Sequence, residues 1–308
     1  MITGLVKYSG NMNLRIFGAV IVLLAVLPEL GPSQSREAGK SGPVEVTSLL
    51  GRKLYGLPDD DGSIRVAQQS LAANPKNVAL VLQLSKAQAA KRQYREAVAT
   101  CTSRLAFAPE NADLHLERGH RELGLREFAA ALADLKRAVE LNPNQLDEYY
   151  HLGLAHYFLR QFGEAAESFR KALNLARTSD SVIDCSNWLY VSLRRAGQAE
   201  GAAQVLTRIT PDMKNKEPHL LFYLRLLRFY QGALSENQIL PPKPAGAADI
   251  EGELSFDTVT YGVGNWRLYN NKNPGAAREL FQTVVTGFAW NSWGFIGSEV
   301  ELAKSGGR

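Results

Sequence analysis

Three prolines lie 34 residues apart in this chain, at Pro75, Pro109 and Pro143. Small residues recur at the same interval, at Gly51, Ser85, Gly119 and Gly153. A period of this length is typical of a helix pair that cannot bury its apolar face alone, so that neighbouring pairs stack and share one continuous core. The sequence therefore predicts a helical repeat array whose function lies in the extended surface that it presents.

Four consecutive windows align without a gap from Val44 onward: 44–77, 78–111, 112–145 and 146–179. The third window has its recurring small and apolar residues at Gly119, Ala131, Leu135, Ala138 and Pro143. The fourth has them at Leu152, Gly153, Ala165, Phe169 and Ala172. This pattern resembles the signature of the tetratricopeptide repeat (TPR) family, and the chain is also similar to exported bacterial TPR proteins of undefined role.

The resemblance implies an all-α fold, a right-handed superhelical solenoid of TPR helix hairpins with a C-terminal capping helix. The predicted array spans residues 44–213, in which 180–213 is a degenerate fifth repeat with about three inserted residues. An additional helix is expected within 214–239 and a proline-rich linker at 240–254. Residues 255–308 are predicted to form a further TPR-like hairpin followed by the capping helix.

The N-terminal segment has a different character from the rest of the chain. An uninterrupted apolar run extends from Ile16 to Leu27 and follows the basic residues Lys7 and Arg15. Twelve residues are fewer than the roughly 20 that a membrane-spanning helix needs, but they match the centre of a secretory signal peptide. We expect residues 1–33 to be a signal peptide or an uncleaved anchor, residues 34–43 to be a linker, and the protein to be exported, in the periplasm or secreted.

Charge and motifs exclude several classes of function. The net charge of +4 is spread along the chain, without the basic stripe of a nucleic-acid-binding protein. Two cysteines, Cys101 and Cys185, are expected to be buried as small apolar residues instead of forming a disulfide. No P-loop, nucleophile elbow, HExxH or CxxC motif occurs, so the sequence predicts a protein that is not an enzyme and needs no cofactor.

Four histidines are candidate metal ligands: His115, His120, His151 and His156. Within each predicted helix the two histidines are five residues apart, which directs the rings to different faces. His120 and His151 can still meet across adjacent first helices. Hydrogen-bonded histidines at the groove are therefore favoured over a metal site.

In the TPR family the first helix of each pair lines the concave side of the solenoid, so that the residue after each small residue points inward. That position holds Arg52, Lys86, His120 and Leu154. The resemblance thus implies a groove lined by Arg52, Gln83, Lys86, Glu117, His120, Tyr150, His151 and Tyr157. Such a surface suits a carboxylate or an extended acidic peptide.

The sequence favours a non-enzymatic scaffold or adaptor that holds a segment of a protein partner in this groove. One alternative is an envelope assembly factor that acts through its convex edge or by self-association. The other is an enzyme whose residues lie in the less regular C-terminal part, with Asp257, Tyr261 and Trp266 as candidates. Contact with a membrane is expected only through the N-terminal segment.

Overall fold

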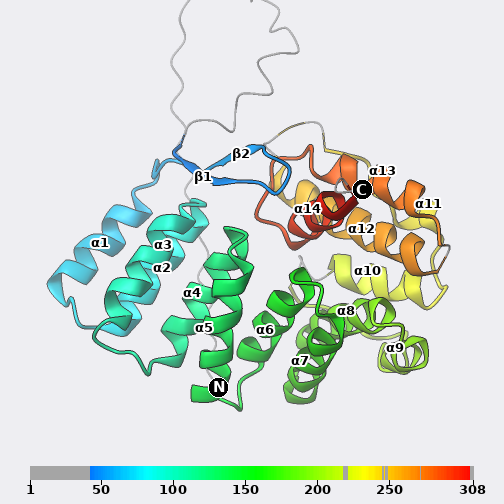
Figure 1. Ribbon diagram of the computed structural model, residues 1–308, viewed down its shortest axis with the longest axis horizontal. Helices are drawn as coiled ribbons and strands as arrows, with labels where there is room; N and C mark the ends of the chain where they lie inside the picture. The colour runs from blue at the N-terminus through cyan, green and yellow to red at the C-terminus, as the bar shows by residue number, and fades with distance from the viewer. Residues whose placement is uncertain (1–41, 218–220, 245, 247–248, 271, 306–308) are drawn as a thin grey trace, which may run out of the picture.

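The structure, a computed structural model, describes residues 42–217, 221–244, 246, 249–270 and 272–305. Helices make up most of this part of the chain, and Figure 1 shows an arc of helices that begins with α1 beside a second group that contains α10 to α14. The all-α solenoid expected from the sequence is the observed fold, with a short β-hairpin added. The predicted signal peptide or anchor, residues 1–33, lies outside the described residues.

The first window, 44–77, is not a helix pair. Its first half forms two antiparallel strands, β1 (Val44–Thr47) and β2 (Lys53–Tyr55). Three of the four residues of β1 are β-branched and favour an extended backbone. Gly51 lies between the strands at a φ of 81°, where glycine is favoured, so it marks a turn and not a close approach of helices. Only the second helix of this predicted repeat is present, as α1 (Ser63–Ala73).

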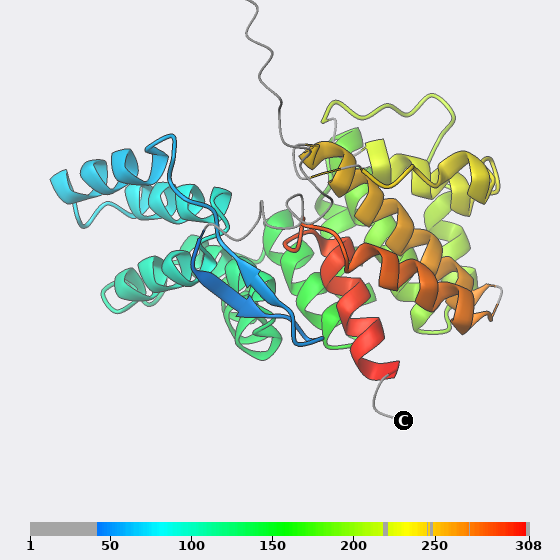
Figure 2. The same ribbon diagram turned by 90° about the horizontal axis from the view of Figure 1, so that it is seen from above.

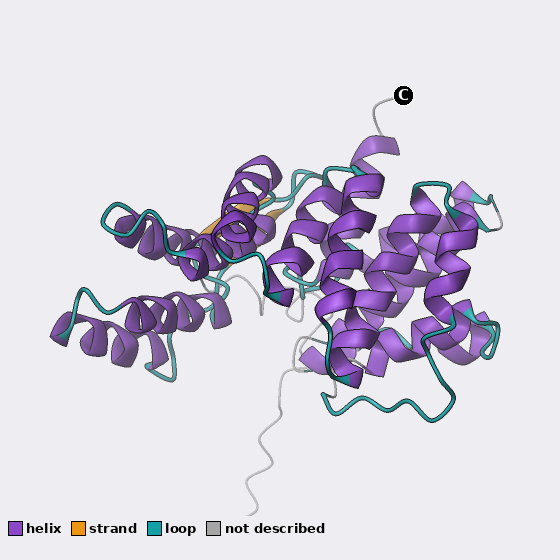
Figure 3. Cartoon of the chain, turned by 90° about the horizontal axis from the view of Figure 1, so that it is seen from below, coloured by secondary structure: helices purple, strands orange, loops and turns teal. Residues whose placement is uncertain are grey.

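The following windows each contain a pair of helices. In chain order these are α2 (Val78–Ala90) with α3 (Tyr94–Leu105), α4 (Ala112–Gly124) with α5 (Phe128–Leu141), α6 (Leu146–Phe158) with α7 (Phe162–Leu175), and α8 (Ser179–Arg195) with α9 (Ala199–Leu206). Figure 3 shows these helices packed side by side, with the strands confined to one hairpin among the described residues.

The small residues of the repeat lie where the two helices of a pair approach each other. A Cβ atom added at Gly119 would lie 2.8 Å from Leu135, and one added at Gly153 would lie 2.7 Å from Phe169. The aromatic residues that begin the second helices α3 and α5, Tyr94 and Phe128, are buried in the core. Both cysteines are also buried and free, which confirms their predicted role as small apolar residues.

After the array, α10 (Leu221–Tyr230) packs against α8, and the short α11 (Glu236–Ile239) follows. The chain then forms α12 (Ile250–Tyr269), α13 (Pro274–Val284) and α14 (Trp293–Ser305), which we call the C-terminal lobe. Helix α12 begins inside the segment expected to be linker, because the Asp249 side chain accepts a hydrogen bond from the Gly252 amide and caps the helix.

The C-terminal lobe is built like one more repeat with a helix added. Gly264 of α12 faces the ring of Phe281 in α13, as Gly153 faces Phe169 in the array. Helix α14 packs on both α12 and α13. Figure 2 shows the β-hairpin lying between the first helix pairs of the array and α14. The hairpin therefore connects the array to the C-terminal lobe. None of the helices that the structure describes is apolar over a length sufficient to cross a bilayer.

We predict that Gly153→Ala lowers the free energy of unfolding by about 1–3 kcal/mol, because the added Cβ would press on the fully buried Phe169 ring, which is stacked on Trp188. This loss outweighs the gain of about 1 kcal/mol that alanine has over glycine in a helix. The matched control is Gly163→Ala in α7, where a Cβ would meet nothing within 4 Å. Chemical denaturation measures both variants, and equal stability of the two would contradict the packing argument.

Candidate functional site

The residues predicted to line the groove lie in three different environments. Gln83 and Lys86 of α2 and Arg52 are exposed, His120 and His151 are half-buried, and Glu117, Tyr150 and Tyr157 are buried. Arg52 does not lie on a first helix, because it follows the hairpin turn. Its guanidinium donates to the carbonyl oxygens of Val285 and Gly287, at 2.8 and 2.9 Å. Arg52 therefore joins the hairpin to the segment that precedes α14.

The three buried residues are engaged within the protein. Glu117 forms an ion pair with Arg121 at 2.9 Å and accepts a hydrogen bond from Ser85 at 2.8 Å. Tyr150 donates to Asp184 at 2.8 Å, and burial raises the pKa of that carboxyl to about 7.

Tyr157 is only 2 % exposed, and its hydroxyl accepts a hydrogen bond from the Tyr261 hydroxyl of the C-terminal lobe at 3.1 Å. The expectation that Tyr157 lines an open groove is therefore wrong. At this repeat the C-terminal lobe covers Tyr157.

His120 and His151 meet across α4 and α6, with ring centroids 4.3 Å apart. Trp293, at the start of α14, lies next to His120, with its ring centroid 5.4 Å from that of His120. Burial lowers the pKa of both histidines, and the charge of Arg121 lowers both further. The described residues contain no group of three or more His, Cys, Asp or Glu side chains that could hold a metal ion.

Three arginines that the sequence analysis did not single out hold the C-terminal lobe. Arg92, Arg126 and Arg160 are 34 residues apart, and each lies in the turn between the two helices of a repeat at a φ of 54°, 64° and 64°, respectively. We call this set the arginine ladder. A left-handed backbone costs a residue other than glycine about 1–2 kcal/mol. The same turn in the next repeat is occupied by Gly197, at a φ of 77°.

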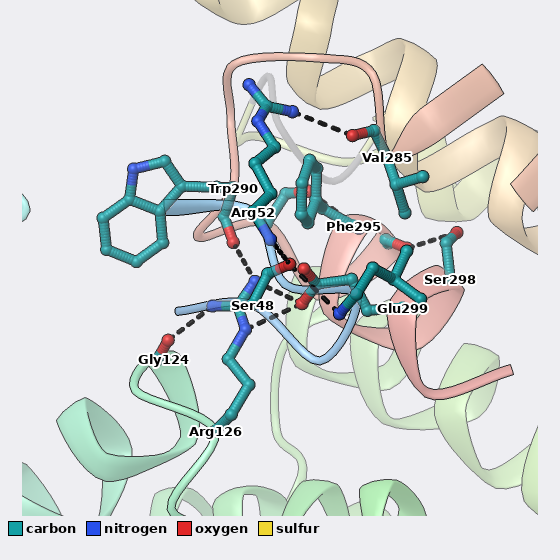
Figure 4. Close-up of polar contacts among 12 residues, drawn as sticks. Ser48, Arg52, Gly124, Arg126, Val285, Trp290, Phe295, Ser298 and Glu299 are labelled. Carbon is teal, nitrogen blue, oxygen red and sulfur yellow. Dashed lines mark hydrogen bonds and ion pairs between the residues drawn. The ribbon is translucent and has the colours of Figure 1, made fainter. Parts of the chain in front are cut away.

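Each arginine of the ladder reaches the C-terminal lobe or the segment just before α14. Arg92 donates to the carbonyl oxygen of Phe288 at 3.0 Å. Arg126 donates to the Glu299 carboxylate and to the carbonyl oxygen of Trp290, both at 2.8 Å (Figure 4). Arg160 pairs with Glu301 at 2.9 Å.

The central contact of the ladder is a buried ion pair. The side chains of Arg126 and Glu299 are 3 % and 1 % exposed, respectively. The guanidinium also lies over the rings of Trp290 and Phe295, with its carbon 5.6 and 5.8 Å from the ring centroids. Burial raises the pKa of Glu299, and Arg126 opposes that rise. The pair therefore depends on both partners being in place.

A sequence signal for the ladder existed. The tripeptides Arg92-Gln93-Tyr94, Arg126-Glu127-Phe128 and Arg160-Gln161-Phe162 have the repeat spacing. Their aromatic residues lie in the core or pack against it, whereas the arginines before them bind the C-terminal part of the chain. A long side chain repeated at a position that favours glycine indicates a function for that side chain.

The lobe thus covers one part of the concave surface and leaves another part open. Trp293 covers His120 of α4 and packs on Phe158 of α6, with ring centroids 5.9 Å apart. Lys86 is the residue equivalent to His120 in the preceding repeat. Both Lys86 and Gln83 are exposed. The open part of the concave surface therefore lies along α2, next to the covered part.

The three C-terminal candidates for an enzyme site do not share a cleft among the described residues. Asp257 is fully buried and accepts a hydrogen bond from Ser292 at 2.6 Å. The Tyr261 hydroxyl donates a hydrogen bond to the Tyr157 hydroxyl, whereas Trp266 packs on Phe229 with ring centroids 5.1 Å apart. Each residue has a separate structural contact.

Comparison with known proteins supports the repeat. A sequence model of the tetratricopeptide repeat matches residues 146–179, the window of α6 and α7. No curated protein matches the chain in sequence. Residues 146–179 are therefore a tetratricopeptide repeat, and the helix pairs on either side continue the same architecture.

Several solved structures are similar to this chain. A crystal structure of MamA is 24 % identical and has a TM-score of 0.43, with 48 % of this chain and 85 % of that chain covered. MamA from Desulfovibrio magneticus RS-1 is 23 % identical, with a TM-score of 0.43 and coverage of 48 % and 82 %. A tetratricopeptide repeat protein from Parabacteroides merdae is 20 % identical, with a TM-score of 0.48 and coverage of 78 % and 90 %. At these identities and scores the similarities carry no functional argument.

We predict that Arg126→Gly lowers the free energy of unfolding by about 3–5 kcal/mol, because Glu299 loses the partner of a buried charge while glycine still accepts the left-handed turn. The double variant Arg126→Gly/Glu299→Gln should recover part of this loss, since the unpaired charge is removed. Arg137→Ala, which breaks an exposed pair with Glu140, is the control and should cost less than about 1 kcal/mol. Urea denaturation compares the variants, and similar costs for the Arg126 and Arg137 changes would refute the role of the ladder.

Proposed function

We propose that this tetratricopeptide repeat protein is a non-enzymatic interaction scaffold, and that a partner segment binds along the open part of its concave surface. The repeat architecture supports a protein-interaction scaffold in general, because stacked helix pairs present an extended concave wall. The observation that carries the proposal is that Gln83 and Lys86 are exposed. In the next repeat, by contrast, the residue equivalent to Lys86 is His120, and Trp293 lies against it.

The chemistry of this surface favours an acidic segment in extended form. Lys86 has no ion pair with any described residue, so its ammonium group is available to a carboxylate. The amide of Gln83, one helical turn away on α2, can donate to and accept from the main chain of a bound peptide. Both side chains are long and solvent-exposed, which suits weak and adaptable recognition.

The partner surface is tested with a defined probe, a displayed library of random peptides selected on the full chain. We expect acidic peptides to be enriched, and Lys86→Glu to weaken the binding of a selected peptide at least tenfold, because the attractive charge becomes repulsive. Lys136→Glu makes the same charge change at an exposed position of α5, a second helix of its repeat, and should leave the affinity unchanged. Fluorescence anisotropy measures the affinity, and equal binding by both variants would exclude the α2 surface.

A further inference from the structure

The β-hairpin presents exposed leucines at its turn. Figure 1 shows the hairpin along one edge of the molecule. Leu49 and Leu50 lie between β1 and β2 and are 41 % and 43 % exposed, whereas most large apolar side chains of the described residues are buried. The Ser48 hydroxyl accepts hydrogen bonds from the amides of Leu50 and Arg52, at 3.2 and 3.1 Å. The turn is therefore fixed with its leucines in solvent, and we call Leu49 and Leu50 the hairpin tip.

A groove opens beside the hairpin tip. Its volume is about 630 Å³, and it lies between the tip, α13 and the C-terminal end of α14. Val285 and Leu302 line it together with the tip leucines, so that much of its wall is apolar. Arg278 and Gln282 line it from α13, with Thr286 just after that helix. The groove thus combines an apolar wall with a few polar groups.

The charged side chains at this groove are basic. Arg278 is exposed and forms no ion pair with another described residue. Lys243 donates to the hydroxyl of Thr286, and Arg52 donates to the carbonyl oxygen of Val285 at 2.8 Å. No acidic side chain of the described residues lines the groove. A complementary occupant therefore carries apolar groups together with negative charge.

The carboxylates on this side of the molecule are buried or engaged elsewhere. Glu253 and Glu299 are each 1 % exposed, so they present little charge at the surface. Glu279 follows Arg278 on α13, but it interacts with Arg267 of α12. An anionic group at the groove therefore meets Arg278 without displacing an ion-pair partner among the described residues.

The position of the hairpin in the chain indicates which occupant fits. The described residues begin at Gly42, and the Gly56 amide donates to the Pro43 carbonyl oxygen at 3.0 Å, so the chain enters the fold at the hairpin. The apolar run that ends at Leu27 is separated from Gly42 by residues 28–41. Fully extended, a segment of this length spans at most about 50 Å. A bilayer that holds the apolar run lies within this distance of the start of the hairpin.

We propose that the hairpin tip and the groove beside it bind the surface of a bilayer that contains anionic lipid. The leucines enter the interfacial layer, flexible acyl chains fill the apolar groove, and Arg278 and Lys243 meet lipid phosphate groups. Stable attachment to a membrane commonly needs two weak signals acting together. In this chain the apolar run supplies one and the hairpin supplies the other. The proposal goes beyond the scaffold function, since it adds a membrane contact outside the N-terminal segment.

Fluorescence of a single attached dye tests the proposal on the full chain. Cys101 and Cys185 are buried, and burial raises the pKa of both thiols, so the two native cysteines react slowly with a dye. An environment-sensitive dye is attached to the variant Leu50→Cys. The matched variant is Phe107→Cys, in the connection between α3 and α4, where the native side chain is 81 % exposed.

Both variants keep the apolar run, so membrane binding by that run is common to them. The vesicles are either neutral phosphatidylcholine or contain about one third anionic phosphatidylglycerol, and a spin-labelled lipid is the quencher. In anionic vesicles we expect quenching at position 50 to exceed that at position 107 at least about twofold, because only the tip enters the lipid.

Charge reversal tests the role of the basic groove. Arg278→Glu should remove most of the difference between the two positions, because the attractive charge becomes repulsive. Arg208→Glu makes the same charge change at an exposed residue after α9 and should leave the difference unchanged. Circular dichroism establishes that each variant is folded.

Equal quenching at positions 50 and 107 would overturn the proposal. A difference that survives Arg278→Glu, or that is as large in neutral vesicles, would also overturn it. A dye at position 50 that responds to an acidic, apolar peptide and not to vesicles would assign the groove to a protein partner instead. The peptide measurement at Lys86 uses no vesicles, so its failure and the failure of this contact are separate results.

Discussion

The turn inside each repeat is the constraint on which this structure depends. Two antiparallel helices joined by so short a connection force one residue into the left-handed region, where glycine is the favoured choice. At three successive turns the chain has arginine instead, and each guanidinium binds the lobe or the segment that leads into α14. The three arginines of the ladder thus have both a strained, left-handed backbone and a side chain that binds the C-terminal part of the chain.

This link makes the array and the lobe energetically dependent on each other. A buried pair such as Arg126 and Glu299 gains little net stability over a well-packed apolar pair, but losing one partner is expensive. The pair holds Glu299 of α14 at the turn between α4 and α5. The rings of Trp290 and Phe295, which lie under the same guanidinium, supply the apolar part of the contact.

The repeat period predicted the helix pairs, but it did not predict contacts between residues far apart in the sequence. Helix pairs from α2 to α9 follow from it, and the inserted residues near 180 explain why Gly197 lies 37 residues after Arg160 instead of 34. The period failed at Gly51, because a glycine in a hairpin turn has the same spacing as a glycine in a packed helix. It also could not show that Tyr157 is covered, since the Tyr261 that covers it lies 104 residues further along the chain.

The concave surface consequently has two parts with different properties. One part, along α2, is open and basic at Lys86, and the other, along α4 and α6, is closed by the lobe. The stacked pair of His120 and His151, with Trp293 against His120, lies at the boundary between the two parts.

The distance between the array and the lobe in solution tests the account most directly. Spin labels are attached at positions 136 and 304, both exposed, on α5 and α14, and pulsed electron resonance measures the distance distribution at pH 7.5. A single narrow distribution that does not change on dilution with unlabelled protein is the predicted result. A broad distribution, or a component that disappears on dilution because the lobe docks on another copy, would contradict a lobe held on its own concave surface.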